Sequence, residues 1–384
     1  MDRRAFIRIA GGGVILAAGA PVSGCSPAMP AEAVAPWQGP AAQSDLRRWL
    51  LGYAILAPHS HNLQSWLVDL SVPDRILLHC DLQRLLPETD PHSRQIMMSQ
   101  GTFIELLDLA ARERGYRTEV VLFPEGVFGP DKPDARPVAS IRLAADATVS
   151  KDPLFAQILQ RHTNRSAYDP ARAVPAQAWQ AMAAAAATQP LRFGHVGPDQ
   201  PERLQQQRAL AAEAWRIELV TPRTVMESYR LLRVGPEEVA RHRDGLTLLD
   251  PKVVWLERLG LFDRSQPPAP DDYATTSQIN EFNAKLESTP GFLWLLSQDN
   301  QRPTQVNAGR AYARVQLAAT AQGVVMQPLQ QALQEYPEQA GPYAQIHRLL
   351  GEPGQTVQMW ARVGFAPPAG PAPRRGIEAH ILRT

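Results

Sequence analysis

Two stretches far apart in the chain carry the same pattern of apolar and polar positions. Apolar residues recur at helical spacing in SQGTFIELLDLAARERGY (99–116) and in NAGRAYARVQLAATAQGV (307–324). The two stretches align without a gap, so that Gly101 matches Gly309, and each stretch ends close to a glycine suited to a left-handed helix cap. The pattern therefore predicts two helices of one kind.

The segments that flank these two stretches also follow the same order. A short apolar run and a polar loop precede each predicted helix, and apolar runs with strand character follow it. The preceding runs are 76–80 and 292–296, and the following runs are 120–123, 139–143 and 357–363. Two Ala-rich amphipathic helices could align this well by chance, but the matched order of their neighbours favours an internal duplication. Two such halves would pack about a pseudo-twofold axis as an intramolecular pseudo-dimer, with a crevice between them.

Composition and charge narrow the classes of function. With 384 residues and 44% hydrophobic content, the chain is large enough to bury a full core. Its 39 basic and 38 acidic side chains leave a formal net charge of +1, so no global field would gather nucleic acid or an anionic membrane. Cys25 and Cys80 form neither a disulfide framework nor a zinc pattern. We therefore expect no nucleic-acid partner and no metal, and any anion site must be local.

The N-terminal residues are typical of an export signal. The sequence DRRAFIR (2–8) precedes an apolar, Gly-rich stretch that is too short to span a membrane, and the pair of arginines resembles a twin-arginine signal. Cys25 then fits a lipoprotein processing site, although an ordinary signal with a chance cysteine would read the same way. We expect residues 1–25 to direct the protein to the periplasm, with a lipid anchor at Cys25 as the only link to a membrane. Residues 26–43, rich in Ala and Pro, are expected to be a tether outside the fold.

The densest polar cluster of the first half is APHSHNLQSW (57–66), after a helical stretch that Pro58 should end. Its donors, acceptors and aromatic ring suit the edge and face of a planar heteroaromatic ligand. The side chains concerned are His59, Ser60, His61, Asn62, Gln64 and Trp66. A metal held by the two histidines is a weaker interpretation because no acidic or thiol ligand lies near. A serine nucleophile is weaker still, since no G-x-S-x-G motif surrounds Ser60.

Cationic side chains gather in the second half, where they could hold a phosphate by charge-assisted hydrogen bonds. RHTNRSAYDP (161–170) contributes Arg161, Thr163 and Arg165, and a Pro/Gly-rich loop near the C-terminus leads to Arg374 and Arg375. Solvated surface arginines are the ordinary alternative. The sequence has no P-loop and no G-x-G-x-x-G after a predicted strand, which argues against a separate dinucleotide domain.

These clusters together resemble the motifs of FMN-dependent nitroreductases. APHSHNLQSW is similar to the family's A-P-S-x-x-N-x-Q-P-W loop, and RHTNRSAYD is similar to its R-R-S-x-R-x-F motif. The ending VGFAPPAGPAPRRGIEAHI resembles the family's G-Y-P…P-R-R close. Ordinary members carry the loop and the phosphate motif in one subunit of a homodimer. Here the two motifs lie in different halves, which resembles the tandem, Acg-like branch.

The resemblance implies an α+β, nitroreductase-like fold of two fused half-domains, with a mixed or antiparallel sheet flanked by helices. The halves would be 44–150 and 151–384, with a helical insertion at about 199–290 that could form a lid. Arg161, Thr163 and Arg165, with Arg374 or Arg375, would hold the phosphate and ribityl end of FMN. Ser60, Asn62, Gln64 and Trp66 would meet the rest of the flavin in the one site expected to survive. His59 in place of Ser, and Ser65 in place of the Pro before Trp66, depart from the family's pattern.

The function implied is an oxidoreductase that passes hydride through flavin N5 to nitroaromatic or quinone-like acceptors. The reductant would be NAD(P)H or another donor, and no side chain need act as a catalytic acid or base. The resemblance also implies an alternative, a protein with a covered flavin that sequesters or stores FMN without NAD(P)H turnover. A lipoprotein with an empty pocket is the third hypothesis.

Overall fold

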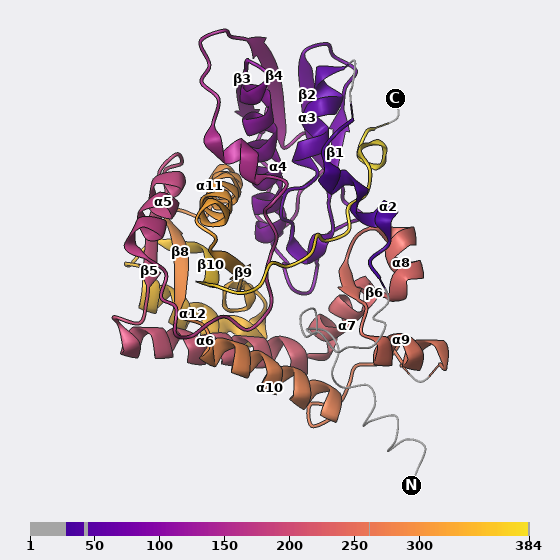
Figure 1. Cartoon of the computed structure of the whole chain (residues 1–384), viewed down its shortest axis with the longest axis vertical. Helices are drawn as coiled ribbons and strands as arrows, with labels where there is room; N and C mark the ends of the chain where they lie inside the picture. The colour runs from indigo at the N-terminus through magenta and orange to yellow at the C-terminus, as the bar shows by residue number, and fades with distance from the viewer. Residues whose placement is uncertain (1–27, 42–44, 261, 383–384) are drawn as a thin grey trace.

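The computed structural model describes residues 28–41, 45–260 and 262–382 of the chain. These residues form two four-stranded sheets surrounded by helices, so the predicted α+β class is confirmed (Figure 1). The predicted export signal (1–25) lies outside the described residues. Within them, no helix combines the length and the apolar character that a membrane crossing requires.

The first half builds an antiparallel sheet with the order β1-β2-β4-β3. Its elements are α3 (Leu46–Ala54), β1 (Trp66–Asp69), β2 (Arg75–Cys80), α4 (Arg94–Glu113), β3 (Tyr116–Leu122) and β4 (Ala139–Ala145). Asp45 begins α3 by accepting a hydrogen bond from the Arg47 amide at 2.8 Å. Alternate residues of β2 are buried, which places one face of this sheet on the core.

The second half builds an antiparallel sheet with the order β5-β8-β10-β9. Its elements are η3 (Pro153–Gln157), α5 (Ala176–Ala186), β5 (Arg192–Val196), β8 (Gly291–Ser297), α11 (Arg302–Ala321), β9 (Val325–Pro328) and β10 (Thr356–Gly364). Between β9 and β10 lie η4 (Gln331–Leu333), η5 (Pro337–Gln339) and α12 (Ala340–Leu350). If the strands of each half are taken in chain order, both sheets arrange them in the same way. The helices α4 and α11 occupy the same place in the two series, as their sequence alignment predicts.

The helices α4 and α11 cross at the two glycines that the sequence alignment matches. A Cβ atom added to Gly101 would lie 1.8 Å from the carbonyl oxygen of Val306. One added to Gly309 would lie 1.8 Å from the carbonyl oxygen of Met98, and Met98 is the residue that the alignment pairs with Val306. The contact is therefore reciprocal, as in an isologous interface between two copies of one surface. Only glycine lets the two backbones approach so closely.

A helical insertion separates β5 from β8, close to the predicted span of 199–290. It comprises α6 (Pro201–Val220), α7 (Pro222–Leu231), β6 (Leu232–Val234), α8 (Gly235–His242), β7 (Leu246–Leu248), α9 (Pro251–Arg258) and α10 (Tyr273–Glu287). The helices α6 and α10 pack beside the second sheet, where Phe282 joins Phe292 and Trp360 in one apolar cluster (Figure 1). The strands β6 and β7 form a small parallel pair nearer to the first half.

Both ends of the described chain cross the boundary between the halves. After β10, the C-terminal arm (365–382) runs to the first sheet, where the Val68 amide donates to the His380 carbonyl at 2.7 Å (Figure 1). This arm, which includes η6 (Ile377–Ala379), covers the edge strand β1. The N-terminal arm (28–41) contains α2 (Ala31–Val34) and η1 (Ala35–Gln38), and it buries Ala33 and Trp37. The expected tether outside the fold is therefore wrong for residues 28–41.

The insertion contains a buried acid, Glu218, whose titration should make the free energy of unfolding depend on pH. Its carboxylate accepts a hydrogen bond from the Gln334 amide at 2.7 Å, but burial dominates and raises the pKa of Glu218 to about 7. The folded state thus holds this proton more tightly than the unfolded state, and its contribution to stability is lost as pH rises from about 4.5 to 7.

When pH rises from 4 to 8, the free energy of unfolding of the wild type should fall relative to that of Glu218→Gln by an amount on the order of 2 kcal/mol. The glutamine has no proton to lose, so its stability should not change for this reason. Urea unfolding of both proteins at the two pH values measures this difference. Glu202→Gln, which changes an exposed carboxylate of the same helix, is the control and should show no such difference. An equal response of the two variants would contradict the assignment.

Candidate functional site

The polar loop between α3 and β1 holds an unusual backbone. His61, Asn62 and Gln64 have φ angles of 50°, 53° and 54°, in the left-handed region that residues other than glycine rarely adopt. This loop contains η2 (Ser60–Asn62), which is hydrogen-bonded to side chains of α4. The Ser60 amide donates to Ser99 Oγ at 3.2 Å, and the Ser60 hydroxyl donates to Gln95 Oε1 at 3.2 Å. Such strain persists only where surrounding contacts fix the backbone, and it is concentrated at functional sites.

The two residues that depart from the family's loop pattern contact each other. The Ser65 amide donates to His59 Nε2 at 3.1 Å, and Ser65 Oγ lies 2.6 Å from the same nitrogen. His59 Nδ1 lies 2.8 Å from the Ser60 carbonyl oxygen, and burial lowers the pKa of His59 to about 3. A neutral His59 and Ser65 thus fix the loop by hydrogen bonds, at the two positions where the nitroreductase pattern has serine and proline. In the described part of the chain, no group of three or more His, Cys, Asp or Glu side chains could hold a metal.

Two of the predicted cationic residues meet at the end of α3. The Arg161 guanidinium donates to the Leu56 carbonyl at 2.8 Å, and the Arg374 guanidinium donates to the same oxygen at 3.2 Å. Arg374 also donates to Asn62 Oδ1 at 2.6 Å. The arginine of the second half, the arginine of the C-terminal arm and the polar loop of the first half therefore converge, as the sequence predicts.

Arg161 and Arg374 are buried without a negative partner. They are 2% and 3% exposed, and no ion pair joins either one to a carboxylate within the described ranges. Burial lowers the pKa of Arg161 to about 10 and that of Arg374 to about 9, and for Arg374 the neighbouring Arg161 lowers it further. Among the described residues, the Nε atom of each side chain has no hydrogen-bond partner. Because buried, unpaired charges are costly, this pair is suited to an anion.

The other predicted residues of the 161–170 loop lie beside this pair. Thr163 is half-buried, and Arg165 keeps an exposed side chain. Burial, and to a lesser extent the positive charge of Arg165, lower the pKa of His61 to about 4. The cluster therefore carries a net positive charge from three arginines and no charge from its histidines at neutral pH.

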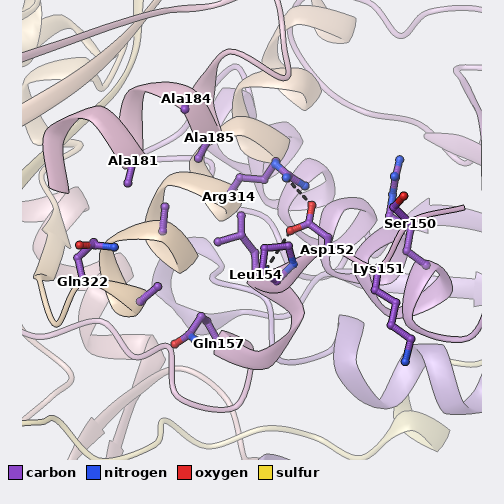
Figure 2. Close-up of a pocket in the computed structure, with 14 residues that line it drawn as sticks. Ser150, Lys151, Asp152, Leu154, Gln157, Ala181, Ala184, Ala185, Arg314 and Gln322 are labelled. Atoms are coloured by element: carbon purple, nitrogen blue, oxygen red, sulfur yellow. Dashed lines mark hydrogen bonds and ion pairs between the residues drawn. The ribbon is translucent and has the colours of Figure 1, made fainter. Parts of the chain in front are cut away.

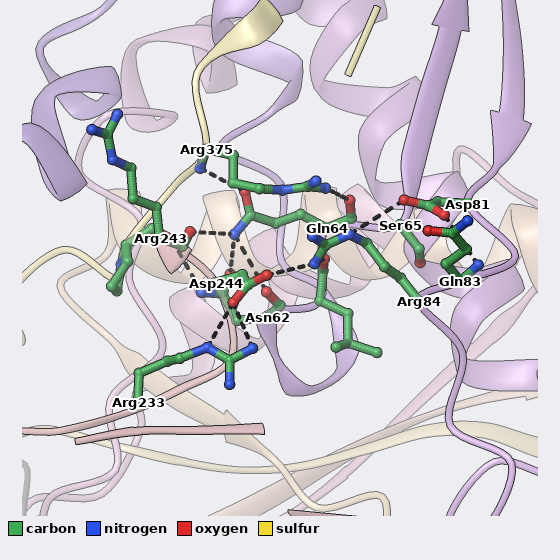
Figure 3. Close-up of polar contacts among 12 residues, drawn as sticks. Asn62, Gln64, Ser65, Asp81, Gln83, Arg84, Arg233, Arg243, Asp244 and Arg375 are labelled. Atoms are coloured by element: carbon green, nitrogen blue, oxygen red, sulfur yellow. Dashed lines mark hydrogen bonds and ion pairs between the residues drawn. The ribbon is translucent and has the colours of Figure 1, made fainter. Parts of the chain in front are cut away.

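Gln64 and Arg375 form hydrogen bonds with each other, and Gln64 also bonds the insertion (Figure 3). Gln64 Oε1 accepts from the Arg375 amide at 2.9 Å, and Gln64 Nε2 donates to the Arg243 carbonyl at 2.8 Å. The Arg375 guanidinium in turn donates to the Gln64 carbonyl. Beside them, the buried Asp244 pairs with Arg84 and Arg233, so the insertion is fastened to the loop. Both side chains thus have partners within the protein, and their contact with a ligand stays a prediction.

Trp66 also has its partners within the protein. Its ring is fully buried between His59 and Phe103, and its indole N–H donates to the Ser99 carbonyl at 3.0 Å. The side chain belongs to the first core, and its contact with a cofactor stays a prediction.

Sequence reasoning missed three residues that the structure adds to the cluster. Gln316, on α11, accepts from the Arg161 guanidinium at 3.0 Å, and the buried Tyr312 one turn earlier has a hydroxyl without a hydrogen-bond partner. Trp37, from the N-terminal arm, packs its ring on both buried guanidiniums. The first two resemble ordinary positions of an amphipathic helix in the sequence, and Trp37 is the lone aromatic residue of a Pro/Ala-rich stretch. No local signal marks any of the three.

A cavity of about 590 Å³ is lined by none of the predicted site residues (Figure 2). Alanines of α5 and α11 line it together with Leu154 and Gln157. Its Arg314 already pairs with Asp152 at 2.6 Å and with Glu105 at 2.9 Å. The charge of this arginine is compensated, unlike the charges of Arg161 and Arg374. The cluster around Arg161 and Arg374 is therefore the candidate site.

Comparison with known proteins relates the chain to nitroreductases. No family model matches the sequence. The chain is 27% identical over 363 residues to a protein named "putative NAD(P)H nitroreductase" from Mycobacterium tuberculosis, in each of two strains, CDC 1551 and H37Rv. The alignment covers 88% of this chain and 94% of each relative. Along most of its length, the chain is therefore similar to proteins of the nitroreductase family.

Among solved structures, the FMN-dependent nitroreductase NfnB from Mycobacterium smegmatis, in complex with NADPH, matches with 17% identity. This match covers 60% of this chain and 98% of that chain, with a TM-score of 0.38.

Proposed function

We propose that this protein binds one FMN in the candidate site and acts as a nitroreductase-like oxidoreductase. The observation that carries the proposal is the pair of buried arginines, Arg161 and Arg374, without a carboxylate to neutralise them. The phosphate of FMN would supply two negative charges and several acceptor oxygens at this point. The similarity to proteins named putative NAD(P)H nitroreductases supports the proposed activity.

The residues around the pair divide between the ends of the cofactor. Arg161 and Arg374 would hold the phosphate, and Thr163 and Arg165, from the same loop as Arg161, would contribute to the phosphate and ribityl end. Ser60 and Asn62 would meet the flavin from the first half. Bound FMN would supply hydride transfer between a reductant and an acceptor, so the protein itself needs to orient the flavin and to shape access to it. We propose nitroaromatic or quinone-like acceptors and NAD(P)H as the reductant.

On this proposal, the two halves of one chain form a tandem pseudo-dimer with a single FMN site, and the protein works as a monomer. Equal strand orders and the reciprocal contact of α4 with α11 support the duplication. In α4, the positions aligned with Tyr312 and Gln316 hold Ile104 and Asp108. An apolar side chain and a carboxylate cannot favour a phosphate, so the second half-site is not expected to bind FMN.

Sequestration of FMN is the second candidate, and one observation favours it. The insertion and the C-terminal arm fasten the polar loop through Gln64, Asp244 and Arg375, which leaves Gln64 fully buried. A flavin held under such a cover would exchange slowly and would meet a nicotinamide poorly. The proposed export of the protein, with or without a lipid anchor at Cys25, adds to this case because NAD(P)H is scarce in the periplasm.

Anaerobic reduction separates the two candidates. We expect the purified protein to carry FMN absorption that NADPH bleaches within minutes, because a reductase must admit the donor to the flavin. Dithionite, a small reductant, is the control and should bleach the flavin in either case. A flavin that dithionite bleaches and NADPH leaves unchanged would contradict turnover and support storage.

A further inference from the structure

The N-terminal arm lies against the two buried arginines of the candidate site. The Trp37 ring centroid is 5.5 Å from Arg161 Cζ and 5.2 Å from Arg374 Cζ, and the His162 ring lies 4.7 Å from it. Trp37 is only 9% exposed, so these contacts are shielded from water. An aromatic face attracts a cation most strongly where both groups are desolvated.

Two hydrogen bonds fasten this arm to the C-terminal arm that carries Arg374. The Trp37 indole N–H donates to the Ala372 carbonyl at 2.8 Å, and the Arg374 amide donates to the Ala33 carbonyl at 2.8 Å. The N-terminal arm and the C-terminal arm are thus hydrogen-bonded to each other beside the two buried arginines. Arg161 comes from the second half and Arg374 from the C-terminal arm, and the Trp37 ring contacts both.

The two like charges beside this ring repel each other, since Arg161 lowers the pKa of Arg374, and no ion pair with a described carboxylate involves either guanidinium. The Nη groups of both guanidiniums already donate to neutral oxygen acceptors, and among the described residues their Nε atoms find no hydrogen-bond partner, so an anion would be met by the Nε donors or would replace the neutral acceptors. A ring in this place offsets part of the repulsion and fixes the planes of the two guanidiniums before a ligand arrives. Preorganised donors bind more tightly because less order has to be imposed on binding.

We infer that Trp37 is a positioning residue of the anion site, which sets Arg161 and Arg374 for a phosphate monoester and lets the N-terminal arm control its retention. This inference rests on the proposed function, because FMN is the phosphate ester concerned. It assigns to residues 30–38 a role in cofactor binding, although they lie outside both sequence motifs.

The test is FMN binding to the full chain, measured by quenching of flavin fluorescence in a titration of the apoprotein. Trp37→Leu should raise the FMN Kd about tenfold, the effect of losing a desolvated cation–π contact. Trp37→Phe, which keeps an aromatic face, should stay within about threefold of the wild type. Trp255→Leu, which removes an exposed tryptophan (65%) on α9, is the matched control and should leave the Kd unchanged.

A second variant shows whether Trp37 acts through Arg374. Arg374→Lys keeps the charge but loses the planar face that the ring contacts. Trp37→Leu should therefore raise the Kd by a smaller factor when Arg374→Lys is already present than it does in the wild type, because the contact between the ring and Arg374 is then already lost and only the contact with Arg161 remains to be removed. Should Trp37→Leu fail to fold by circular dichroism, Trp37→Met replaces it in the same cycle.

Additive effects of the two changes, or a wild-type Kd in Trp37→Leu, would overturn the inference and leave the proposed function intact. Equal losses in Trp37→Leu and Trp37→Phe would also overturn it, since the indole hydrogen bond would then matter more than the ring. A wild-type protein that binds no FMN would contradict the proposed function itself.

Discussion

Arg161→Ala should weaken FMN binding by about 1.5 to 3 kcal/mol, which is roughly a 10- to 150-fold rise in Kd. The guanidinium is buried and has no carboxylate partner, so its loss removes a charged donor that only a ligand anion can neutralise. The FMN-free variant should lose little stability. Arg161 donates its hydrogen bonds to the neutral acceptors Leu56 and Gln316, and the variant no longer has to bury the charge of this arginine. Flavin fluorescence in a titration of the apoprotein gives the Kd.

Arg348→Ala is the control for this prediction, because Arg348 is an exposed arginine on α12, an element that contributes nothing to the candidate site. It should bind FMN as the wild type does. Riboflavin, which lacks the phosphate, should distinguish wild type from Arg161→Ala far less than FMN does. If both variants bind FMN with wild-type affinity, Arg161 does not hold the phosphate.

Gly101→Ala and Gly309→Ala should each lower the free energy of unfolding by about 3 kcal/mol, at the upper end of the range for overpacking. Each added Cβ would lie 1.8 Å from a backbone carbonyl oxygen of the partner helix. Backbone atoms cannot rotate away as a side chain can, so α4 and α11 would have to separate. Urea unfolding followed by circular dichroism measures the loss.

The double variant tests the reciprocity of the contact. Because one separation of the two helices relieves both clashes, Gly101→Ala with Gly309→Ala should cost less than the two single changes together. Gly341→Ala is the control, since an added Cβ there would meet no atom within 4 Å and alanine favours the helix α12. Single variants as stable as this control would show that the helices do not approach as described.

The repeated pattern predicts the regular elements of the fold well because they depend on local periodicity. The helices expected at 99–116 and 307–324 appear as α4 and α11, and the apolar runs appear as β2, β3, β4, β8 and β10. The arms could not be predicted in this way. Residues 28–41 have the composition of a tether, and their burial depends on contacts with Arg374 and Ala372, more than 300 positions away in the chain.

The residues of the candidate site could also be predicted only in part. Sequence motifs predict the types of residue that converge, and Asn62, Arg161 and Arg374 lie together as expected. Gln64 and Trp66 fit the same motif, but tertiary contacts with the insertion and the first core take up their polar groups. Whether a polar group faces a ligand or a neighbour depends on packing that the motif does not encode.

The central claim is that one chain assembles one anion site for one flavin from its two halves. Isothermal titration of the full-length apoprotein with FMN tests this claim most directly, because it gives the stoichiometry and the affinity together. We predict one FMN per chain, with riboflavin bound much more weakly because it leaves Arg161 and Arg374 unpaired. Two FMN per chain, equal affinity for the two flavins, or no binding of FMN would contradict it.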